Sequence, residues 1–359
     1  MEVKKNYQAI QLGLAINELT GKTAWRSPSN IALVKYWGKY GRQLPSNPSV
    51  SFTLKNAHTN MRMNYQPGNG QVVLFFEKER NTAFELRITQ FIKSIEDIYP
   101  FLQGLNLEIH SDNSFPHSAG IASSASAMSA LALCLCSIER QVFGGLTTED
   151  EFLQKASYLS RLASGSACRS VYPKLGQWGD HEKIQGSTNS FAIDVSDAVD
   201  PIFHTFKNSI LIASAKEKSV SSSAGHQLME NNPYAAVRFK QAKDNLAKLM
   251  KAMKEGDINV FIQIVEEEAL TLHALMMTST PSYVLMKPDS LVLIEKIRAY
   301  REKTGLPVCF TLDAGPNLHV LYPEHIATQV QAFIKEECQL YCENGLIIED
   351  EVGVGAYKL

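Results

Sequence analysis

The segment FPHSAGIASSAS, residues 115–126, constrains the fold of this chain more than any other. Pro116 and Gly120 shape a turn, and the pattern predicts a helix from about 120 to 139. Small residues, among them Ala122, Ser123 and Ser124, keep bulk away where that helix begins. The amides and the dipole of such a helix N-terminus bind phosphate groups. A helix packed closely on a sheet also needs small residues, so the segment alone leaves both interpretations open.

The hydroxyls of Ser123 and Ser124 add to the phosphate interpretation. They can donate hydrogen bonds to phosphate or supply one oxygen ligand to magnesium, which prefers oxygen and keeps several waters. The segment is not a Walker motif, because the G-K-[ST] ending is absent.

Composition narrows the class of protein. The 359 residues favour two domains at roughly 150 residues each, and 45% hydrophobic with 20% charged residues is ordinary for a globular protein with a sizeable core. The net charge of -2 gives no overall basic field for nucleic acid or anionic membrane. No apolar run approaches the ~18 residues of a membrane span. An anionic ligand must therefore be bound by a local site.

Cysteine usage and the N-terminus predict a cytoplasmic protein. Six scattered cysteines are too few for a disulfide scaffold. Cys134 and Cys136 would point to different sides of a helix, and Cys338 and Cys342 have no second pair to complete a zinc site. We expect reduced structural thiols. The first 21 residues resemble a small amphipathic helix more than a signal peptide.

The order of predicted elements indicates an α+β fold in two parts. Residues 148–151 have capping-box spacing for the helix expected at 149–163. Further strands are expected at 29–36, 49–54, 72–76 and 105–110, with a helix at 81–98. After residue 206, the pattern predicts strands at 209–215, 307–312, 318–322 and 346–349, and helices at about 233–254, 258–277, 289–303 and 324–338. Gly305 is expected to close the helix at 289–303. The predicted parts are a helical extension at 1–22, an N-terminal domain at 23–205 and a C-terminal domain at 206–359.

Four segments together resemble one known family. PHSAGIASSAS resembles the P-x-x-x-G-L-x-S-S-A motif of the galactokinase, homoserine kinase, mevalonate kinase and phosphomevalonate kinase superfamily. SNIALVKYWGK, at 29–39, resembles the N-I-A-x-x-K-Y-W-G-K signature of mevalonate diphosphate decarboxylases. ASGSACRS at 163–170 and DAGPN at 313–317 match two further blocks, although Ala163 stands where the family has glycine.

The resemblance implies a reaction and a fold. The fold is the two-domain α+β kinase architecture of that superfamily, with the active site in the interdomain cleft. The reaction is ATP-dependent decarboxylation of (R)-5-diphosphomevalonate to isopentenyl diphosphate, with ADP, phosphate and carbon dioxide released. ATP and magnesium are the implied cofactors, with no nucleic-acid or membrane partner. A homodimer is expected from the family, although no pattern in this sequence marks an interface.

The run from Lys35 to Lys39 supplies charge near aromatic residues. Strand alternation places Lys35, Trp37 and Lys39 on one face and Tyr36 on the other, unless the strand ends there. A solvated edge strand is the plainer interpretation. The resemblance instead places Lys35 near the reacting groups and Tyr36 and Lys39 at the diphosphate end, with Trp37 also among the substrate contacts.

The other two blocks supply a donor set and a carboxylate. Arg169 offers a planar fork that matches a carboxylate, although a helix cap with a surface arginine would show the same pattern. The resemblance assigns Arg169 to the substrate carboxylate and Ser164 and Ser166 to the diphosphate and nearby oxygens. Asp313 suits a turn by itself. The resemblance makes it the residue that faces the tertiary hydroxyl, as base or as electrostatic orienter.

The remaining expected contacts also come from the resemblance. Segment 219–225, SVSSSAG, resembles the family's V-S-S-x-x-G-M, which makes Ser222 a substrate contact. Some relatives have a basic residue in place of Ser223, and His226 replaces the usual methionine. The expected nucleotide contacts, with Ser124 also as the metal ligand, are Asn113, Pro116, Gly120, Ala122, Ser123 and Ser124.

Two alternatives remain at this stage. One is a relative that only phosphorylates mevalonate or its monophosphate at the 3-position, or that decarboxylates a different phosphorylation state. The other is a non-catalytic member that kept the fold. The presence of Lys35, Trp37 and Asp313 favours the full decarboxylase, and the intact Arg169 and Ser123–Ser124 loop argue against loss of catalysis.

Overall fold

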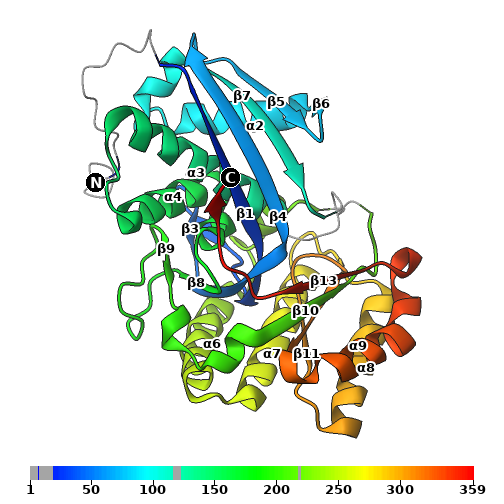
Figure 1. Cartoon of the computed structure of the whole chain (residues 1–359). Helices are drawn as coiled ribbons and strands as arrows, with labels where there is room; N and C mark the ends of the chain where they lie inside the picture. The colour runs from blue at the N-terminus through cyan, green and yellow to red at the C-terminus, as the bar shows by residue number, and fades with distance from the viewer. Residues whose placement is uncertain (1–6, 8–18, 116–122, 217–219) are drawn as a thin grey trace.

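The computed structural model describes residues 7, 19–115, 123–216 and 220–359, which form two large sheets covered by helices (Figure 1). A small third sheet pairs β2 (Lys39–Tyr40) with β3 (Leu44–Pro45). The α+β class predicted from the sequence is confirmed. The larger sheet has the order β14-β1-β4-β7-β5-β6, with β8 and β9 joined to it through β4. Its strands are β1 (Gly21–Val34), β4 (Ser49–Pro67), β5 (Val72–Phe76), β6 (Glu79–Arg80), β7 (Leu105–Asn113), β8 (Leu175–Trp178), β9 (Ala192–Asp194) and β14 (Tyr357–Lys358).

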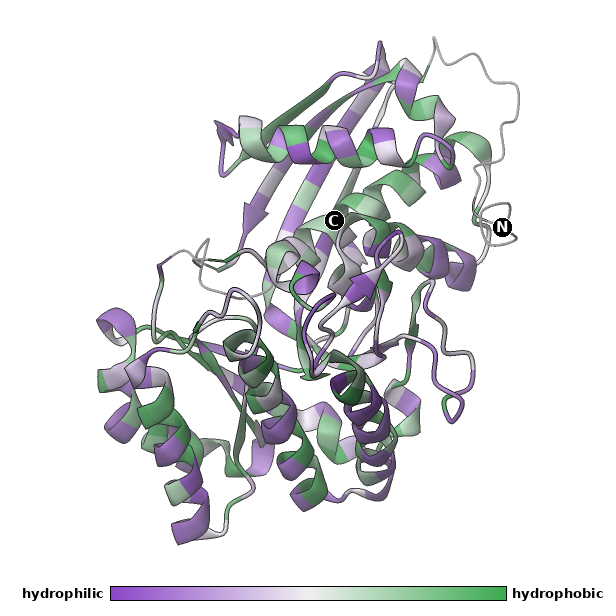
Figure 2. Ribbon diagram, turned by 180° about the vertical axis from the view of Figure 1, so that it is seen from behind, coloured by the Kyte–Doolittle hydropathy of each residue, from purple (hydrophilic) through white to green (hydrophobic). Residues whose placement is uncertain are grey.

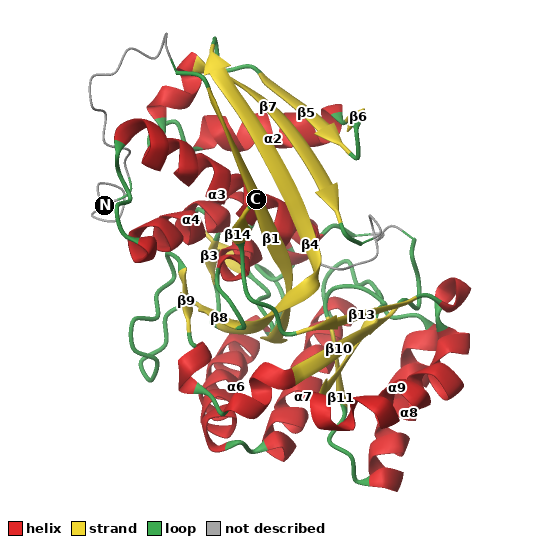
Figure 3. Cartoon of the chain, viewed as in Figure 1, coloured by secondary structure: helices red, strands yellow, loops and turns green. Residues whose placement is uncertain are grey.

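Strands β1 and β4 are the longest strands of this sheet (Figure 3). They pair antiparallel from Gly21 opposite Tyr65 to Val34 opposite Val50, so the strands predicted at 29–36 and 49–54 are only the ends of much longer ones. Register shifts interrupt this pairing between Pro28 and Asn30 and between Ala32 and Val34. Such irregularities re-aim side chains near functional sites.

Three helices cover one face of the larger sheet: α2 (Thr82–Ser94), α3 (Ser123–Phe143) and α4 (Glu149–Ala163). Every side chain of α3 from Ala125 to Glu139 is buried, because small residues let the helix lie close to both the sheet and α4. The capping box at the start of α4 is confirmed, with Thr148 and Glu151 exchanging hydrogen bonds. A 3-10 helix, η3 (Gly165–Val171), follows α4.

The smaller sheet has the order β11-β12-β10-β13 and is antiparallel throughout. Amphipathic helices pack on it, as the alternating colours of Figure 2 show. The strands are β10 (Phe206–Leu211), β11 (Cys309–Leu312), β12 (Leu318–Pro323) and β13 (Ile347–Glu351), and the helices are α5 (Ser222–Gln227), α6 (Ala235–Glu255), α7 (Ile258–Met277), α8 (Pro288–Thr304) and α9 (Ala327–Phe333).

One hydrophobic core joins the two sheets. Phe52 of β4 packs against Phe206 of β10 and Phe261 of α7, with ring centroids 5.7 and 6.1 Å apart. The end of the chain also returns to the first sheet, where Lys358 pairs with Trp25. These contacts fix the end of β1 against α7 and place the residues that follow it between the two sheets.

Some predicted boundaries are wrong for identifiable reasons. The helix expected from about 233 begins at Ala235. The side-chain amide of Asn232 donates a hydrogen bond to the Leu275 carbonyl oxygen, and this contact holds a turn before the helix. The helix expected at 324–338 is broken into α9 and a π turn at Ile334–Cys338. The predicted closure by Gly305, with φ +69°, is confirmed.

Two sequence predictions fall partly or wholly outside the described residues. Of the predicted helical extension at 1–22, only Tyr7 and residues 19–22 are described, and Gly21 already belongs to β1. Pro116, Gly120 and Ala122 of the expected phosphate loop lie outside the described residues. Within the described ranges, every helix is too short or too polar to cross a bilayer. All six cysteines are buried and have free thiols.

Candidate active site

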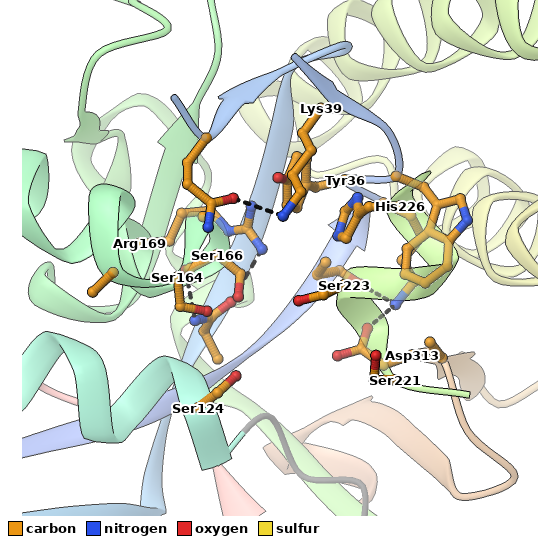
Figure 4. A pocket seen from close by; sticks show the side chains of 18 of the residues that line it. Tyr36, Lys39, Ser124, Ser164, Ser166, Arg169, Ser221, Ser223, His226 and Asp313 are labelled. Atoms are coloured by element: carbon orange, nitrogen blue, oxygen red, sulfur yellow. Dashed lines mark hydrogen bonds and ion pairs between the residues drawn. The ribbon is translucent and has the colours of Figure 1, made fainter. Parts of the chain in front are cut away.

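A pocket of about 460 Å³ lies between the two sheets and gathers most of the predicted site residues (Figure 4). The end of β1, the first turn of α3, η3, α5 and the turn after β11 all contribute side chains to it. The predicted site residues that line it are Lys35, Tyr36, Trp37, Lys39, Ser124, Ser164, Ser166, Arg169 and Asp313. Segments almost 280 residues apart in the chain therefore meet here.

Lys35 and Asp313 form an ion pair on the pocket wall. Lys35 Nζ lies 2.9 Å from Asp313 Oδ1 and 2.6 Å from the Ala32 carbonyl oxygen. The lysine side chain is 2% exposed and the aspartate side chain 28%, so only the carboxylate reaches well into the pocket. Burial lowers the pKa of Lys35, and the attraction of Asp313 partly opposes this.

A second buried ion pair holds the main chain of Lys35. Glu268 of α7 accepts hydrogen bonds from the Lys35 amide at 2.9 Å and from Arg238 Nη1 at 2.7 Å. Arg238 Nη2 in turn donates to the Lys35 carbonyl oxygen at 3.3 Å. Both charged side chains are essentially inaccessible to solvent. Breaking such a pair leaves a charge buried without a partner, so the pair firmly fixes the backbone at the end of β1.

The turn that carries Asp313 is also anchored on both sides. His273 Nε2 lies 3.1 Å from the Asp313 carbonyl oxygen, and this histidine is buried in α7. The Asn317 side chain exchanges hydrogen bonds with the main chain of Ser214, at 2.9 and 3.0 Å. The DAGPN segment thus holds its carboxylate in a fixed direction.

Arg169 is a buried cation held only by neutral groups among the described residues. Its Nε donates to Ser51 Oγ at 3.0 Å, Nη1 to Ser49 Oγ at 2.5 Å and Nη2 to Asn30 Oδ1 at 3.3 Å. The residue is 2% exposed. Burial lowers the pKa of Arg169, the direction expected for a desolvated cation. A buried guanidinium beside a pocket and without a carboxylate partner is suited to bind an anionic ligand.

The strand does end before Tyr36, so the predicted alternation of faces does not apply. β1 stops at Val34, and Lys35, Tyr36, Trp37 and Lys39 all line the same pocket. Gly165 makes room for Tyr36, because a Cβ there would lie 2.8 Å from the tyrosine hydroxyl. Burial raises the pKa of Tyr36 and lowers the pKa of Lys39. Lys39 Nζ donates to Gln43 Oε1 at 3.0 Å.

The expected serine contacts divide into three groups. Ser164, Ser166 and Ser124 line the pocket, the last from the first turn of α3. Ser222 opens α5 between two lining residues, Ser221 and Ser223. Ser123 and Asn113 do not line the pocket, and the Asn113 amide oxygen accepts a hydrogen bond from Thr59 at 2.7 Å.

The structure adds pocket residues to which the sequence analysis gave no role. Asn30 lies within the matched SNIA segment, but its contact with Arg169 joins two distant segments. Arg87 comes from α2, where no local pattern marks it, and Gln43 lies in the loop after Lys39. His226 stands where the family motif has methionine. That departure from the motif is the sequence feature that could have pointed to His226 as a pocket residue.

The pocket is strongly cationic. Among the described residues, its lining has four arginine or lysine side chains, Lys35, Lys39, Arg87 and Arg169, against the one carboxylate of Asp313. A concave site with this charge balance favours a ligand that carries several negative charges.

Comparison with known proteins decides the family. Residues 27–192 match the diphosphomevalonate decarboxylase-like N-terminal domain, and residues 209–350 match the mevalonate 5-diphosphate decarboxylase C-terminal domain. A diphosphomevalonate decarboxylase of Ganoderma lucidum is 30% identical over 86% of this chain and 80% of its own length. The chain belongs to the diphosphomevalonate decarboxylase family. The enzyme of Gibberella zeae is also 30% identical, over 83% of this chain and 80% of its own.

Solved structures of the family have the same fold. Mevalonate diphosphate decarboxylase from Staphylococcus aureus gives a TM-score of 0.82 at 26% identity, over 95% of this chain and 98% of that one. MDDEF in complex with MVAPP, AMPPCP and magnesium gives 0.81 at 25% identity, over 95% and 99%. The two-domain architecture expected from the sequence motifs is confirmed.

Proposed function

We propose that this protein catalyses the ATP-dependent decarboxylation of diphosphomevalonate to isopentenyl diphosphate. The cationic pocket is the observation that carries this proposal, because a member of this family is expected to bind a substrate with a carboxylate at one end and a diphosphate at the other. The related complex with MVAPP, AMPPCP and magnesium supports the same substrate class.

The reaction makes a poor leaving group into a good one. The tertiary hydroxyl oxygen bonds the γ-phosphorus of ATP, the bond from that phosphorus to ADP breaks, and the hydroxyl proton is released. The C3–O bond then breaks and phosphate leaves. As positive charge develops at C3, the bond to the carboxylate breaks, and its electron pair forms the carbon–carbon double bond while carbon dioxide departs. The protein must position both reactants and offset charge in the transition state.

Asp313 and Lys35 are assigned to the hydroxyl and the transferred phosphoryl group. The Asp313 carboxylate reaches the pocket and can accept the hydrogen bond of the tertiary hydroxyl, as base or as orienter. Lys35 holds Asp313 in place through their ion pair and contributes positive charge beside the reacting phosphoryl group.

The ends of the substrate are assigned to separate residues. Arg169 binds the carboxylate through its planar fork, consistent with its buried position and neutral partners. Ser164 and Ser166 are assigned to the diphosphate and nearby oxygens. The other assigned substrate contacts are Tyr36, Trp37, Lys39 and Ser222.

The nucleotide is assigned to the start of α3 and the loop before it. Ser124 fits a magnesium ligand, because it brings a hydroxyl oxygen to a pocket in which phosphates would supply the other oxygens. When bound, magnesium would offset charge on the transferred phosphoryl group. Asn113, Pro116, Gly120, Ala122 and Ser123 remain predicted nucleotide contacts.

The test separates the decarboxylase from its nearest alternative, a 3-kinase. Purified protein is incubated with ATP, magnesium and each of mevalonate, its monophosphate and its diphosphate, and ADP and carbon dioxide are measured separately. We expect both products with the diphosphate. ADP without carbon dioxide would instead establish a kinase, and neither product with any substrate would favour a non-catalytic member. We also expect a cytoplasmic homodimer, which cell fractionation and sedimentation would check.

A further inference from the structure

His226 lies on the pocket wall, and the proposed reaction gives it no role. It belongs to the short helix α5, is 8% exposed and lies beside Tyr36 at the pocket (Figure 4). Its ring centroid is 4.4 Å from that of Tyr36 and 4.6 Å from that of Trp37. A Cβ at Gly225 would lie 2.4 Å from the Trp37 ring, so α5 approaches this wall closely. These contacts fix the orientation of the imidazole.

A main-chain contact determines which nitrogen of this ring carries the proton. The Gly38 amide donates a hydrogen bond to His226 Nδ1 at 2.9 Å. An amide N–H can only donate, so Nδ1 must be unprotonated, and the neutral ring carries its hydrogen on Nε2. Burial, helped by the nearby Lys39 cation, lowers the pKa of His226 to about 3. The ring is therefore neutral at physiological pH, with one donor and one acceptor.

The donor side of the ring has a different environment. Nε2 lies across the ring from the Gly38 contact, and no hydrogen bond from it to any described residue is present. His226 lines the pocket with Lys39, Ser221 and Ser223. Nε2–H is therefore a donor at the pocket wall, with no protein acceptor among the described residues. A ligand with oxygen acceptors at this end of the pocket would pair with it.

We propose that His226 Nε2–H donates a hydrogen bond to the diphosphate of the substrate and so sets the affinity of this chain for that group. The inference rests on the proposed function and deepens it. The diphosphate is favoured over the carboxylate because His226 contacts Tyr36 and lies near Lys39, whereas Arg169 offers the fork suited to the carboxylate. Methionine, which relatives have at this motif position, cannot donate such a bond.

Two substitutions separate the two nitrogens. His226→Asn places an amide oxygen near the position of Nδ1, so it can still accept from Gly38, but it lacks the donor edge. His226→Gln places an amide nitrogen near the position of Nε2 and loses the Gly38 acceptor. The dissociation constants of diphosphomevalonate and of mevalonate 5-phosphate are measured by calorimetry for both variants. His110→Asn is the control, because His110 is a partly exposed histidine on β7 that does not line the pocket.

We expect His226→Asn to weaken diphosphomevalonate binding about 10-fold, and to weaken the monophosphate less, because a hydrogen bond to a charged group is lost. His226→Gln should stay within about 3-fold of the unmodified protein, since it keeps the donor. The inference is overturned if His226→Asn binds normally, if both variants lose equal affinity, or if both ligands weaken equally. A protein that binds diphosphomevalonate but releases no carbon dioxide would refute the proposed function, while the Asn–Gln contrast would still test His226.

Discussion

Replacement of Arg169 by lysine tests whether this buried cation binds the substrate carboxylate. A guanidinium has five N–H donors. The hydrogen bonds to Ser49, Ser51 and Asn30 use three of them and leave two for a ligand. Lysine keeps the charge but has three donors and no planar fork. Its ammonium can therefore serve the three neutral partners or the carboxylate, but not both.

The expected loss follows from that difference. A hydrogen bond to a charged group contributes roughly 1.5–3 kcal/mol. At 1.36 kcal/mol per factor of ten, Arg169→Lys should lower kcat/KM by about 10- to 150-fold. Because Arg169→Lys keeps the positive charge, the loss in kcat/KM reports the geometry of the guanidinium.

A matched control separates this effect from general damage to the core. Arg161 of α4 is 3% exposed, donates to the main-chain oxygens of Arg42 and Ser190, and does not line the pocket. Urea unfolding and steady-state ADP release are measured for Arg169→Lys and Arg161→Lys. Both variants should lose folding stability, but only Arg169→Lys should lose most of its kcat/KM. An Arg169→Lys enzyme with normal affinity and rate, or an equal kinetic loss in Arg161→Lys, would refute the assignment.

Three further predictions concern catalysis, the nucleotide and pH. Asp313→Asn should lower turnover by at least ~10²-fold, with ADP and carbon dioxide falling together and nucleotide binding retained; normal ADP release without carbon dioxide would contradict a role in phosphoryl transfer. Ser124→Ala should reduce turnover with magnesium-ATP, and an unchanged rate at saturating ATP and every magnesium concentration would exclude a metal or phosphate contact. Burial lowers the pKa of His226 to about 3 and that of His319 to about 4. Below about pH 6.5 the unfolded chain therefore binds more protons than the folded one. The free energy of unfolding is highest above that pH and falls as the pH drops, by about 2 kcal/mol per histidine at pH 5. Urea unfolding at pH 7.5 and 5 tests this, and His226→Asn should reduce the difference in the free energy of unfolding by about 2 kcal/mol.

Much of the chemistry could be predicted from short segments. Each matched block is a turn, a strand end or a helix start, and such segments adopt similar local conformations because their own residues dictate the backbone. The capping box at Thr148 and the glycine at 305 illustrate this, since both were confirmed from spacing alone. The family followed from four such blocks in one order, as the comparisons confirm. The roles assigned to individual site residues remain predictions.

Contacts between distant segments could not be predicted in this way. Three features depend on partners far along the chain. They are the long pairing of β1 with β4, the hydrogen bond of the Asn232 side chain to Leu275, and the place of Arg87 in the pocket. No local pattern encodes such partners.

The sequence by itself determined which chemical groups this protein has: a lysine and an aspartate that we assign to the reacting centre, an arginine with a planar fork, and small residues at a helix start. Only the tertiary structure decided their state. It paired Lys35 with Asp313, surrounded Arg169 with neutral acceptors and placed the proton of His226 on Nε2. The physical reason is that charge, protonation and hydrogen-bond direction depend on burial and on neighbours in space, and folding brings those neighbours together from across the chain.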